Sequence, residues 1–99
     1  MVKINDFDSI AEYYDLLEQK NQPLYNLINN FLIKLFKENK ARSILDFTCG
    51  TGAQAIPLAQ QGFDVVGCDI GKNLLRIAKA KSRGLNIKFK CGDVRFSKV

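Results

Sequence analysis

The residues with the clearest chemical potential lie in one short run near the middle of the chain, Asp46 to Gly52, with the sequence DFTCGTG. An apolar segment ends on Asp46 and passes into a turn that contains Gly50 and Gly52. Because glycine has no Cβ, such a turn can bend sharply and let a ligand lie almost against the backbone. Asp46 adds a negative charge at the same place. The run therefore suits a nucleotide-like ligand that also carries a positive charge.

Two further aspartates stand in equivalent positions. Asp69 ends a second apolar segment, and Asp93 follows Cys91 and Gly92 at the end of a third. If the three segments are parallel strands, their carboxyl ends meet at the edge of the sheet where ligands bind. An aspartate after a strand is commonly a cap or turn residue. Three of them beside a glycine turn favour a binding site instead.

The elements that must position these acids alternate between strand and helix from residue 42 onward. This order, with short connections, predicts a Rossmann-like, doubly wound parallel α/β sheet with right-handed crossovers. Pro57 lies early in the first of these helices, so that helix either starts late or kinks. The expected strands are Ser43–Phe47, Asp64–Asp69 and Asn86–Cys91, and the expected helices are Ala53–Gln60 and Asn73–Ser82, the latter closed by Gly84.

The preceding part of the chain predicts a helical cap. Apolar residues recur at helical intervals from Asp6 to Gln19. A second helix begins with a cap at Asn21 or Gln22 and has Pro23 in its first turn. Its apolar stripe is expected to pack on one face of the sheet, and comprises Leu24, Leu27, Ile28, Phe31, Leu32, Leu35 and Phe36. The predicted organisation is a cap over residues 1–41 and the first half of a Rossmann-like domain over residues 42–99.

Two classes of nucleotide fit the glycine turn. Gly50 to Ala55 matches the loose dinucleotide pattern G-x-G-x-x-[GA], with Asp69 near the expected acidic position. A dinucleotide such as NAD would place its anionic pyrophosphate over the turn, where Asp46 would repel it by several kcal/mol at an effective dielectric constant of about 20. S-adenosylmethionine instead offers an ammonium and a sulfonium group, a ribose for Asp69 and an adenine amino group for Asp93. The charges favour adenosylmethionine.

The same residues carry a resemblance to a known family. The run from Ile44 to Gly52 closely resembles the first motif of class I adenosylmethionine-dependent methyltransferases. Val65 to Ile70 looks like their second motif, and Cys91 to Val94 looks like their third. Phe7 to Asp15 is similar to the leader of small-molecule methyltransferases, including the ubiquinone and menaquinone biosynthesis type. One departure is Gly71, which stands where the family usually has a serine cap before the next helix.

This resemblance implies specific roles. Gly50 and Gly52 would border the methionine part of the cofactor, and Asp46 would face its ammonium directly or through water. Asp69 would bind the ribose. Asp93 would bind the adenine amino group with the Val94 amide nearby, and Tyr13 or Tyr14 would close over the cofactor. The expected contacts to S-adenosylmethionine, or to its product S-adenosylhomocysteine, are Tyr14, Asp46, Thr48, Gly50, Thr51, Gly52, Asp69, Ile70, Asp93 and Val94.

Family members have a seven-stranded sheet in the order 3-2-1-4-5-7-6, whereas these 99 residues reach just past the third strand. The resemblance therefore implies that the acceptor-binding half is absent, so no catalytic residue is assigned and the chain alone is expected to be inactive. An apolar strand with an open edge invites pairing. We expect a fragment of a longer methyltransferase, or a chain whose first strand pairs with another chain, including a second copy of itself.

Charge and cysteine content narrow the remaining possibilities. The net charge is +5, and the segment from Lys72 onward is strongly basic. This indicates a solvated face of a helix and an edge strand, with nucleic acid as a less favoured partner. Three cysteines without histidine cannot supply a four-ligand zinc site from one chain, so three reduced, semi-buried thiols are expected and no metal. No signal peptide or membrane-spanning run is present, so we expect a cytoplasmic protein without a membrane partner.

The predicted function is the adenosylmethionine-binding portion of a methyltransferase that acts on a small molecule. A noncatalytic adenosylmethionine-binding or assembly module completed by a partner chain is one alternative. A fragment of an NAD-binding oxidoreductase is a more distant one.

Overall fold

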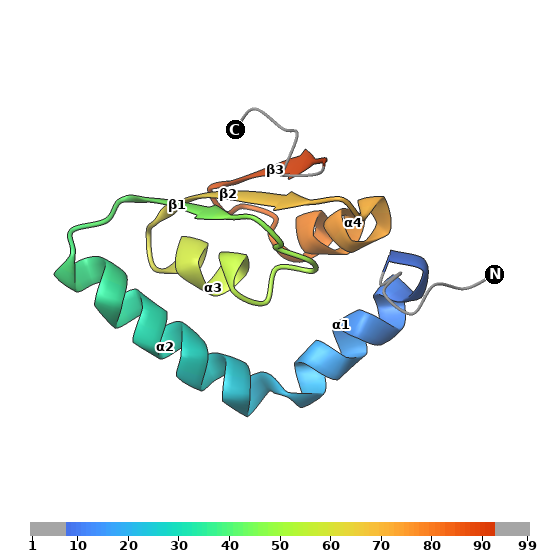
Figure 1. Ribbon diagram of the computed structural model, residues 1–99, viewed down its shortest axis with the longest axis horizontal. Coiled ribbons are helices and arrows are strands. Elements are labelled where there is room, and N and C mark those ends of the chain that lie inside the picture. Colours follow the sequence, from blue (N-terminus) through green and yellow to red (C-terminus); the bar gives the residue numbers. More distant parts are fainter. Residues whose placement is uncertain (1–7, 93–99) are drawn as a thin grey trace.

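The computed structural model describes residues 8–92, and Figure 1 shows their arrangement. The strand–helix alternation expected from residue 42 onward is present, which confirms the predicted α/β class. The elements are a 3₁₀ turn, η1 (Asp8–Ile10), followed by α1 (Ala11–Lys20), α2 (Gln22–Glu38), β1 (Ser43–Asp46), α3 (Ala55–Gln60), β2 (Asp64–Asp69), α4 (Lys72–Lys81) and β3 (Ile87–Cys91).

The sheet is parallel and has the order β1-β2-β3 in the described part of the chain. Asp46 at the end of β1 is level with Gly67, and Asp69 at the end of β2 is level with Cys91. The carboxyl ends of the strands therefore form one edge, as expected for a ligand-binding α/β sheet. All the helices lie on one side of the sheet in Figure 1, with α1 and α2 forming an open V outside α3 and α4.

The helix after the glycine turn begins at Ala55, two residues later than the sequence pattern suggested. Pro57 lies in its first turn, where the missing N–H costs no intrahelical hydrogen bond. Of the two outcomes expected from this proline, the late start is therefore the one observed. Residues 50–54 remain a turn and are free to take the backbone conformations that the glycines provide.

The core fills the space between the sheet and α3 and α4. Phe63 packs edge-on against Phe36 of α2, with ring centroids 6.1 Å apart. The buried cluster consists of Cys49, Ala55, Leu58, Ala59, Phe63, Val65 and Leu75, with Ile33, Phe36, Ile44, Leu85, Ile87 and Phe89 packed against it.

The prediction that the whole apolar stripe of α2 packs on the sheet is wrong. Leu24, Leu27, Ile28, Phe31 and Leu35 are exposed. The covered face of α2 instead follows the spacing of Asn29, Ile33 and Phe36, because α3 lies between α2 and the sheet. A helix in this outer position buries only a narrow strip of its own surface.

Helix α1 lies along α4 and presents acidic side chains to basic ones. Glu12 pairs with Arg76 at 2.8 Å, and Asp15 pairs with Lys81 at 2.5 Å. Two cations of the basic C-terminal segment are thus engaged by the N-terminal helix. No helix in residues 8–92 is long and apolar enough to cross a membrane.

Candidate cofactor site

Asp69 organises the carboxyl edge of the sheet. Its Oδ2 accepts the backbone N–H of Gly50 at 3.0 Å, and its Oδ1 accepts the N–H of Gly71 at 2.9 Å. One carboxylate therefore ties the glycine turn to the start of α4. Each carboxylate oxygen can accept more than one hydrogen bond, so both oxygens retain acceptor capacity for a ligand hydroxyl.

Asp46 lies at the end of the neighbouring strand, half-buried, where it accepts the backbone N–H of Thr48 at 3.3 Å. Burial raises the pKa of the Asp46 carboxyl, and the negative charge of Asp69 raises it further, against the opposing hydrogen bond from Thr48. The carboxylate of Asp69 thus disfavours the charged form of Asp46. A cationic group placed between them would relieve that repulsion.

The glycine turn requires its glycines. Gly50 has a φ of +53° and Gly52 a φ of +93°, in the left-handed region that side chains rarely adopt. A Cβ on Gly52 would lie 2.6 Å from Cδ1 of Ile56, which is closer than any real contact. A Cβ on Gly50 would lie 3.4 Å from the ring of Tyr14 and would narrow the space beside the turn.

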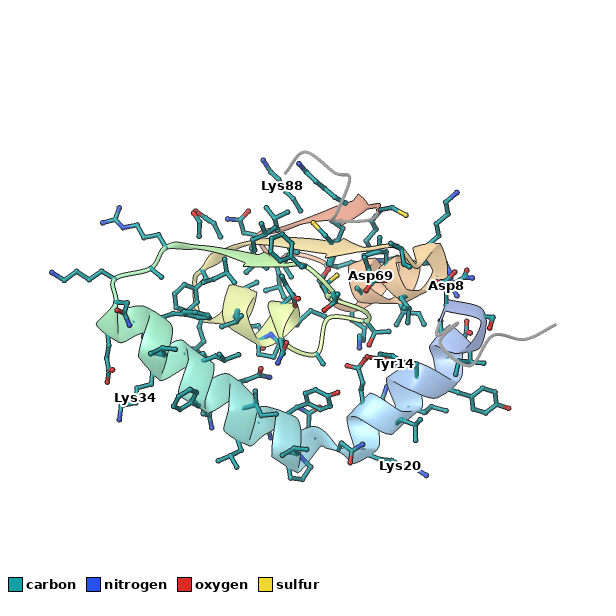
Figure 2. The ribbon with its side chains drawn as sticks, in the orientation of Figure 1. Asp8, Tyr14, Lys20, Lys34, Asp69 and Lys88 are labelled. Atoms are coloured by element: carbon teal, nitrogen blue, oxygen red, sulfur yellow. The ribbon has the colours of Figure 1, made fainter. Side chains whose placement is uncertain are left out.

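Of the two tyrosines expected to close over the cofactor, Tyr14 is the one that the structure brings to the turn. Tyr13 is 69% exposed, whereas Tyr14 is half-buried and its ring lies beside Gly50 (Figure 2). Burial raises the pKa of the Tyr14 hydroxyl, and nearby groups that include Glu18 and Asp69 raise it further. At neutral pH the hydroxyl is therefore protonated and can donate a hydrogen bond.

Thr51 and Glu18 form a buried pair that the sequence reasoning did not identify. Thr51 is 0% exposed, and its hydroxyl donates to Oε1 of Glu18 at 2.9 Å. Burial is the main cause that raises the pKa of Glu18. The sequence offered only a partial signal: Ala11, Tyr14 and Glu18 are spaced three and four residues apart and so share one face of α1, but the spacing does not show that this face is buried.

A pocket of about 170 Å³ opens between the glycine turn and the first two helices. Next to it, the buried side-chain amide of Asn29 donates to the carbonyl oxygen of Ala53 at 2.9 Å. The residues that line the pocket are Tyr14, Glu18, Tyr25, Thr48, Cys49, Ala53 and Gln54. Tyr14 and Thr48 are predicted cofactor contacts, whereas Glu18, Tyr25 and Gln54 were not foreseen.

A larger hollow of about 460 Å³ lies elsewhere, along the middle of the sheet. Its lining includes Leu45, Val66 and Lys88, which are level with one another on the three strands. These side chains alternate with the core residues Ile44, Val65 and Ile87, so they face the uncovered side of the sheet. Neither Asp46 nor Asp69, the acids at the carboxyl ends of β1 and β2, lines this hollow, and we do not assign the cofactor to it.

The cysteines differ from one another more than expected. Cys49 and Cys68 are buried, but Cys91 is exposed, which corrects the expectation of three semi-buried thiols. Cys91 ends an edge strand, so no further strand covers it in the described residues. Burial, followed by the charges of Asp46 and Asp69, raises the pKa of Cys49 to about 12. Cys49 is therefore an un-ionised thiol with a packing role and not a nucleophile.

The remaining predicted cofactor contacts are Ile70, Asp93 and Val94. Ile70 follows Asp69 and is 71% exposed, so its side chain is available to pack against a ligand at the sheet edge. Asp93 and Val94 lie outside the described residues. Across residues 8–92 no group of three or more histidine, cysteine or acidic side chains is arranged to hold a metal ion.

Three comparisons place this geometry in context. A family profile described as "Methyltransferase domain" matches residues 44–98. The glycine/sarcosine N-methyltransferase of Parasynechococcus marenigrum is 42% identical over 69 residues, which cover 68% of this chain and 24% of that protein. The ubiquinone biosynthesis O-methyltransferase of Aliivibrio fischeri is 36% identical over 81 residues, which cover 78% of this chain and 34% of that protein.

A solved structure from Methanococcus maripaludis, of a candidate S-adenosyl-L-methionine-dependent methyltransferase, superposes on the whole chain with a TM-score of 0.80 at 25% identity. The chain covers 48% of that structure and at most about a third of the two relatives. The matched profile spans more than half of the chain and includes β1, the glycine turn and Asp69. The chain belongs to the class I S-adenosylmethionine-dependent methyltransferase family.

Proposed function

We propose that this chain is the cofactor-binding portion of a small-molecule methyltransferase, with a helical cap over residues 1–41 and the first half of the Rossmann-like domain over residues 42–99. The observation that carries the proposal is the acidic glycine turn. Asp46, Asp69 and Glu18 surround a backbone loop that offers no compensating cation of its own among the described residues. A ligand with a positive charge and a ribose fits this site, whereas a pyrophosphate does not.

When bound, S-adenosylmethionine supplies a methyl group on a positively charged sulfur. The residues of this chain bind and orient it, and S-adenosylhomocysteine is the expected product. Asp46 receives the ammonium group and Asp69 the ribose hydroxyls, while Tyr14 covers the cofactor from α1. Thr48 and the glycines border the methionine part, and Ile70 packs beside the nucleoside. Thr51 acts through its hydrogen bond to Glu18, and Asp93 with Val94 completes the adenine contact.

The acceptor is proposed to be a small molecule. The names of two relatives, a glycine/sarcosine N-methyltransferase and a ubiquinone biosynthesis O-methyltransferase, refer to small molecules of different chemistry. Nucleic acid is less favoured, because Arg76 and Lys81 are engaged by α1. We further propose a cytoplasmic location, and pairing of the open edge of β1 with more chain or with a second copy.

Calorimetric titration with adenosylmethionine, adenosylhomocysteine and NAD tests the cofactor assignment. We expect binding of the first two and not of NAD. Asp46→Asn removes the charge that faces the ammonium and should weaken adenosylhomocysteine by about tenfold, the scale of one charge-assisted hydrogen bond.

Asp64→Asn is the matched control for this titration. Asp64 lies at the opposite end of the sheet, where it is hydrogen-bonded to Asn86. Its substitution should leave the affinity unchanged. Tight binding of NAD that Asp46→Asn does not alter would overturn the proposal in favour of a dinucleotide enzyme.

A further inference from the structure

Glu18 is a buried carboxylate of which one of the two oxygens has no hydrogen-bond partner among the described residues. Its side chain lies in α1 and is 7% exposed. Oε1 accepts the Thr51 hydroxyl, whereas Oε2 is buried and has no hydrogen-bond partner among the described residues. An unpaired buried acceptor lowers the stability of the folded chain, and it does so more strongly if it is charged. Such a group in a native structure calls for an explanation, and a ligand, an ion or a water can each supply the missing hydrogen bond.

The position of Glu18 indicates what that partner is. Oε1 lies 3.8 Å from the place where a Cβ on Gly50 would be, so the carboxylate stands directly over the glycine turn. Glu18 also lines the 170 Å³ pocket together with Tyr14 and Thr48. Both Asp15 and Asp46 disfavour its negative charge, whereas Lys81 favours it but is itself paired with Asp15.

We propose that Glu18 is a further cofactor-binding residue, which receives the ammonium group of the methionine part through Oε2 and shares it with Asp46. This inference rests on the proposed function of the chain. It assigns α1 a direct electrostatic part in binding, in addition to the covering role of Tyr14. Because protein atoms cover Oε2, the contact requires a small movement of the side chains that line the pocket.

The competing interpretation is that Glu18 is protonated and merely fastens α1 to the turn through Thr51. The substitution Glu18→Gln separates the two. Glutamine keeps an oxygen that can accept the Thr51 hydroxyl, and it keeps a donor like that of a protonated carboxyl. It lacks the negative charge. If Glu18 is protonated and only holds α1 to the turn, Glu18→Gln should change the cofactor affinity little. If Glu18 is charged and binds the ammonium group, the substitution removes a charge-assisted hydrogen bond and weakens binding.

The test compares two ligands by calorimetry. S-adenosylhomocysteine contains the ammonium group, whereas 5′-methylthioadenosine has the same nucleoside and a thioether but no amino-acid part. We expect Glu18→Gln to weaken adenosylhomocysteine by about tenfold and to leave methylthioadenosine within about twofold. Glu12→Gln, an exposed change on the same helix, should alter neither affinity.

The outcomes separate the role of Glu18 from the cofactor assignment. Equal weakening of both ligands by Glu18→Gln, or no weakening of either, overturns the role of Glu18 while the cofactor assignment stands. Failure of the unsubstituted chain to bind either ligand overturns the proposed function, and this inference with it. Circular dichroism melting of Glu18→Gln guards against a folding defect. If that variant is unfolded, Thr51→Val, which deletes the hydroxyl but keeps the carboxylate, must retain the preference for adenosylhomocysteine, and loss of that preference overturns the proposal.

Discussion

At the scale of single residues, the site is defined by which side-chain atoms already form hydrogen bonds within the protein. Asp69 uses both carboxylate oxygens on backbone N–H groups, and Thr51 uses its hydroxyl on Glu18. Asp46 has its hydrogen bond from Thr48 and an unfavourable neighbour in Asp69. The residues that a sequence pattern presents as equivalent ligand contacts therefore differ in their tasks. Some shape the turn, and others remain available to the cofactor.

Gly52 allows a prediction about stability that separates backbone strain from crowding. Gly52→Ala should destabilise the chain by the cost of a left-handed residue, about 1–2 kcal/mol, plus about 1–3 kcal/mol from overlap with Ile56. Gly62→Ala is the control, because Gly62 has nearly the same φ, +94°, and no atom within 4 Å of the added Cβ. Urea unfolding of both variants measures the difference. Equal losses would show that the contact with Ile56 relaxes without cost.

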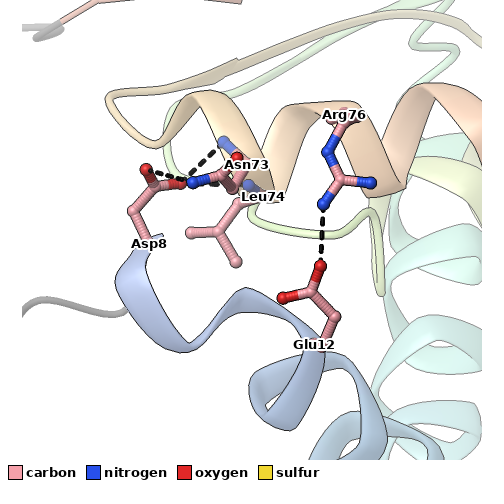
Figure 3. A network of polar contacts seen from close by, with 5 residues as sticks. All are labelled: Asp8, Glu12, Asn73, Leu74 and Arg76. Carbon is pink, nitrogen blue, oxygen red and sulfur yellow. Dashed lines mark hydrogen bonds and ion pairs between the residues drawn. The ribbon is translucent and has the colours of Figure 1, made fainter.

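At the scale of elements, the contact between η1 and α4 explains the departure from the family pattern at Gly71. The N-cap residue of α4, Gly71, makes no side-chain capping hydrogen bond. Asp8 supplies the cap from another element, since its Oδ1 accepts the N–H groups of Asn73 at 2.8 Å and Leu74 at 3.1 Å (Figure 3). A Cβ on Gly71 would lie 2.6 Å from that same oxygen. A serine there would therefore compete with Asp8 for one place.

This arrangement predicts that Asp8→Ala destabilises the chain by about 1 kcal/mol, the usual value for loss of a helix cap. Asp8→Asn should retain most of the stability, because asparagine caps helices about as well as aspartate. The free energy of unfolding of each variant in urea provides the measurement. If the asparagine variant loses as much as the alanine variant, the negative charge near the helix dipole matters more than the cap.

The two halves of the chain differed in how well their elements could be predicted. Strands β1 and β2 were predictable because each carries its own apolar run and ends on an acid, and the bounds Asp64–Asp69 were predicted correctly. The inward face of α2 was not, because Asn29 lies on it and the apolar residues Leu24 and Leu27 do not. Which face a helix buries depends on the element packed against it, and α3 is too short to cover the whole stripe.

The residues of the candidate site also differed in how well the sequence could predict them. Asp46, the glycines and Asp69 could be identified because adjacent sequence carries them, whereas the pairing of Thr51 with Glu18 joins residues 33 positions apart. Glutamate on a helix ordinarily indicates a solvated position. Recognising Glu18 as buried required knowledge that α1 crosses the glycine turn, which no local sequence pattern gives.

At the scale of the whole molecule, the sheet is covered on one side. Leu45 is 40% exposed on the uncovered side and lies in β1, which has no neighbour beyond it in the described part of the chain. An apolar strand with an open edge and an open face is prone to pair with other chains.

We therefore expect concentration-dependent self-association of this chain in sedimentation velocity. Leu45→Lys should shift the population toward monomer without changing the circular dichroism spectrum. Leu27→Lys should leave the association unchanged, because Leu27 lies on α2 and is already 70% exposed. Association that disappears in the Leu27 variant and persists in the Leu45 variant would place the interface on the helices instead. A monomer at all concentrations would contradict the expectation altogether.

The double attachment of Asp69 has a consequence for protein engineering. A designer who wished to change which nucleotide this fold accepts would first alter the acid that faces the ribose. Here that acid also secures the N–H groups of Gly50 and Gly71, so its replacement would disturb the shape of the turn together with its selectivity. Redesign of specificity would have a freer starting point at Asp46 or Glu18, whose substitution leaves both of those backbone attachments in place.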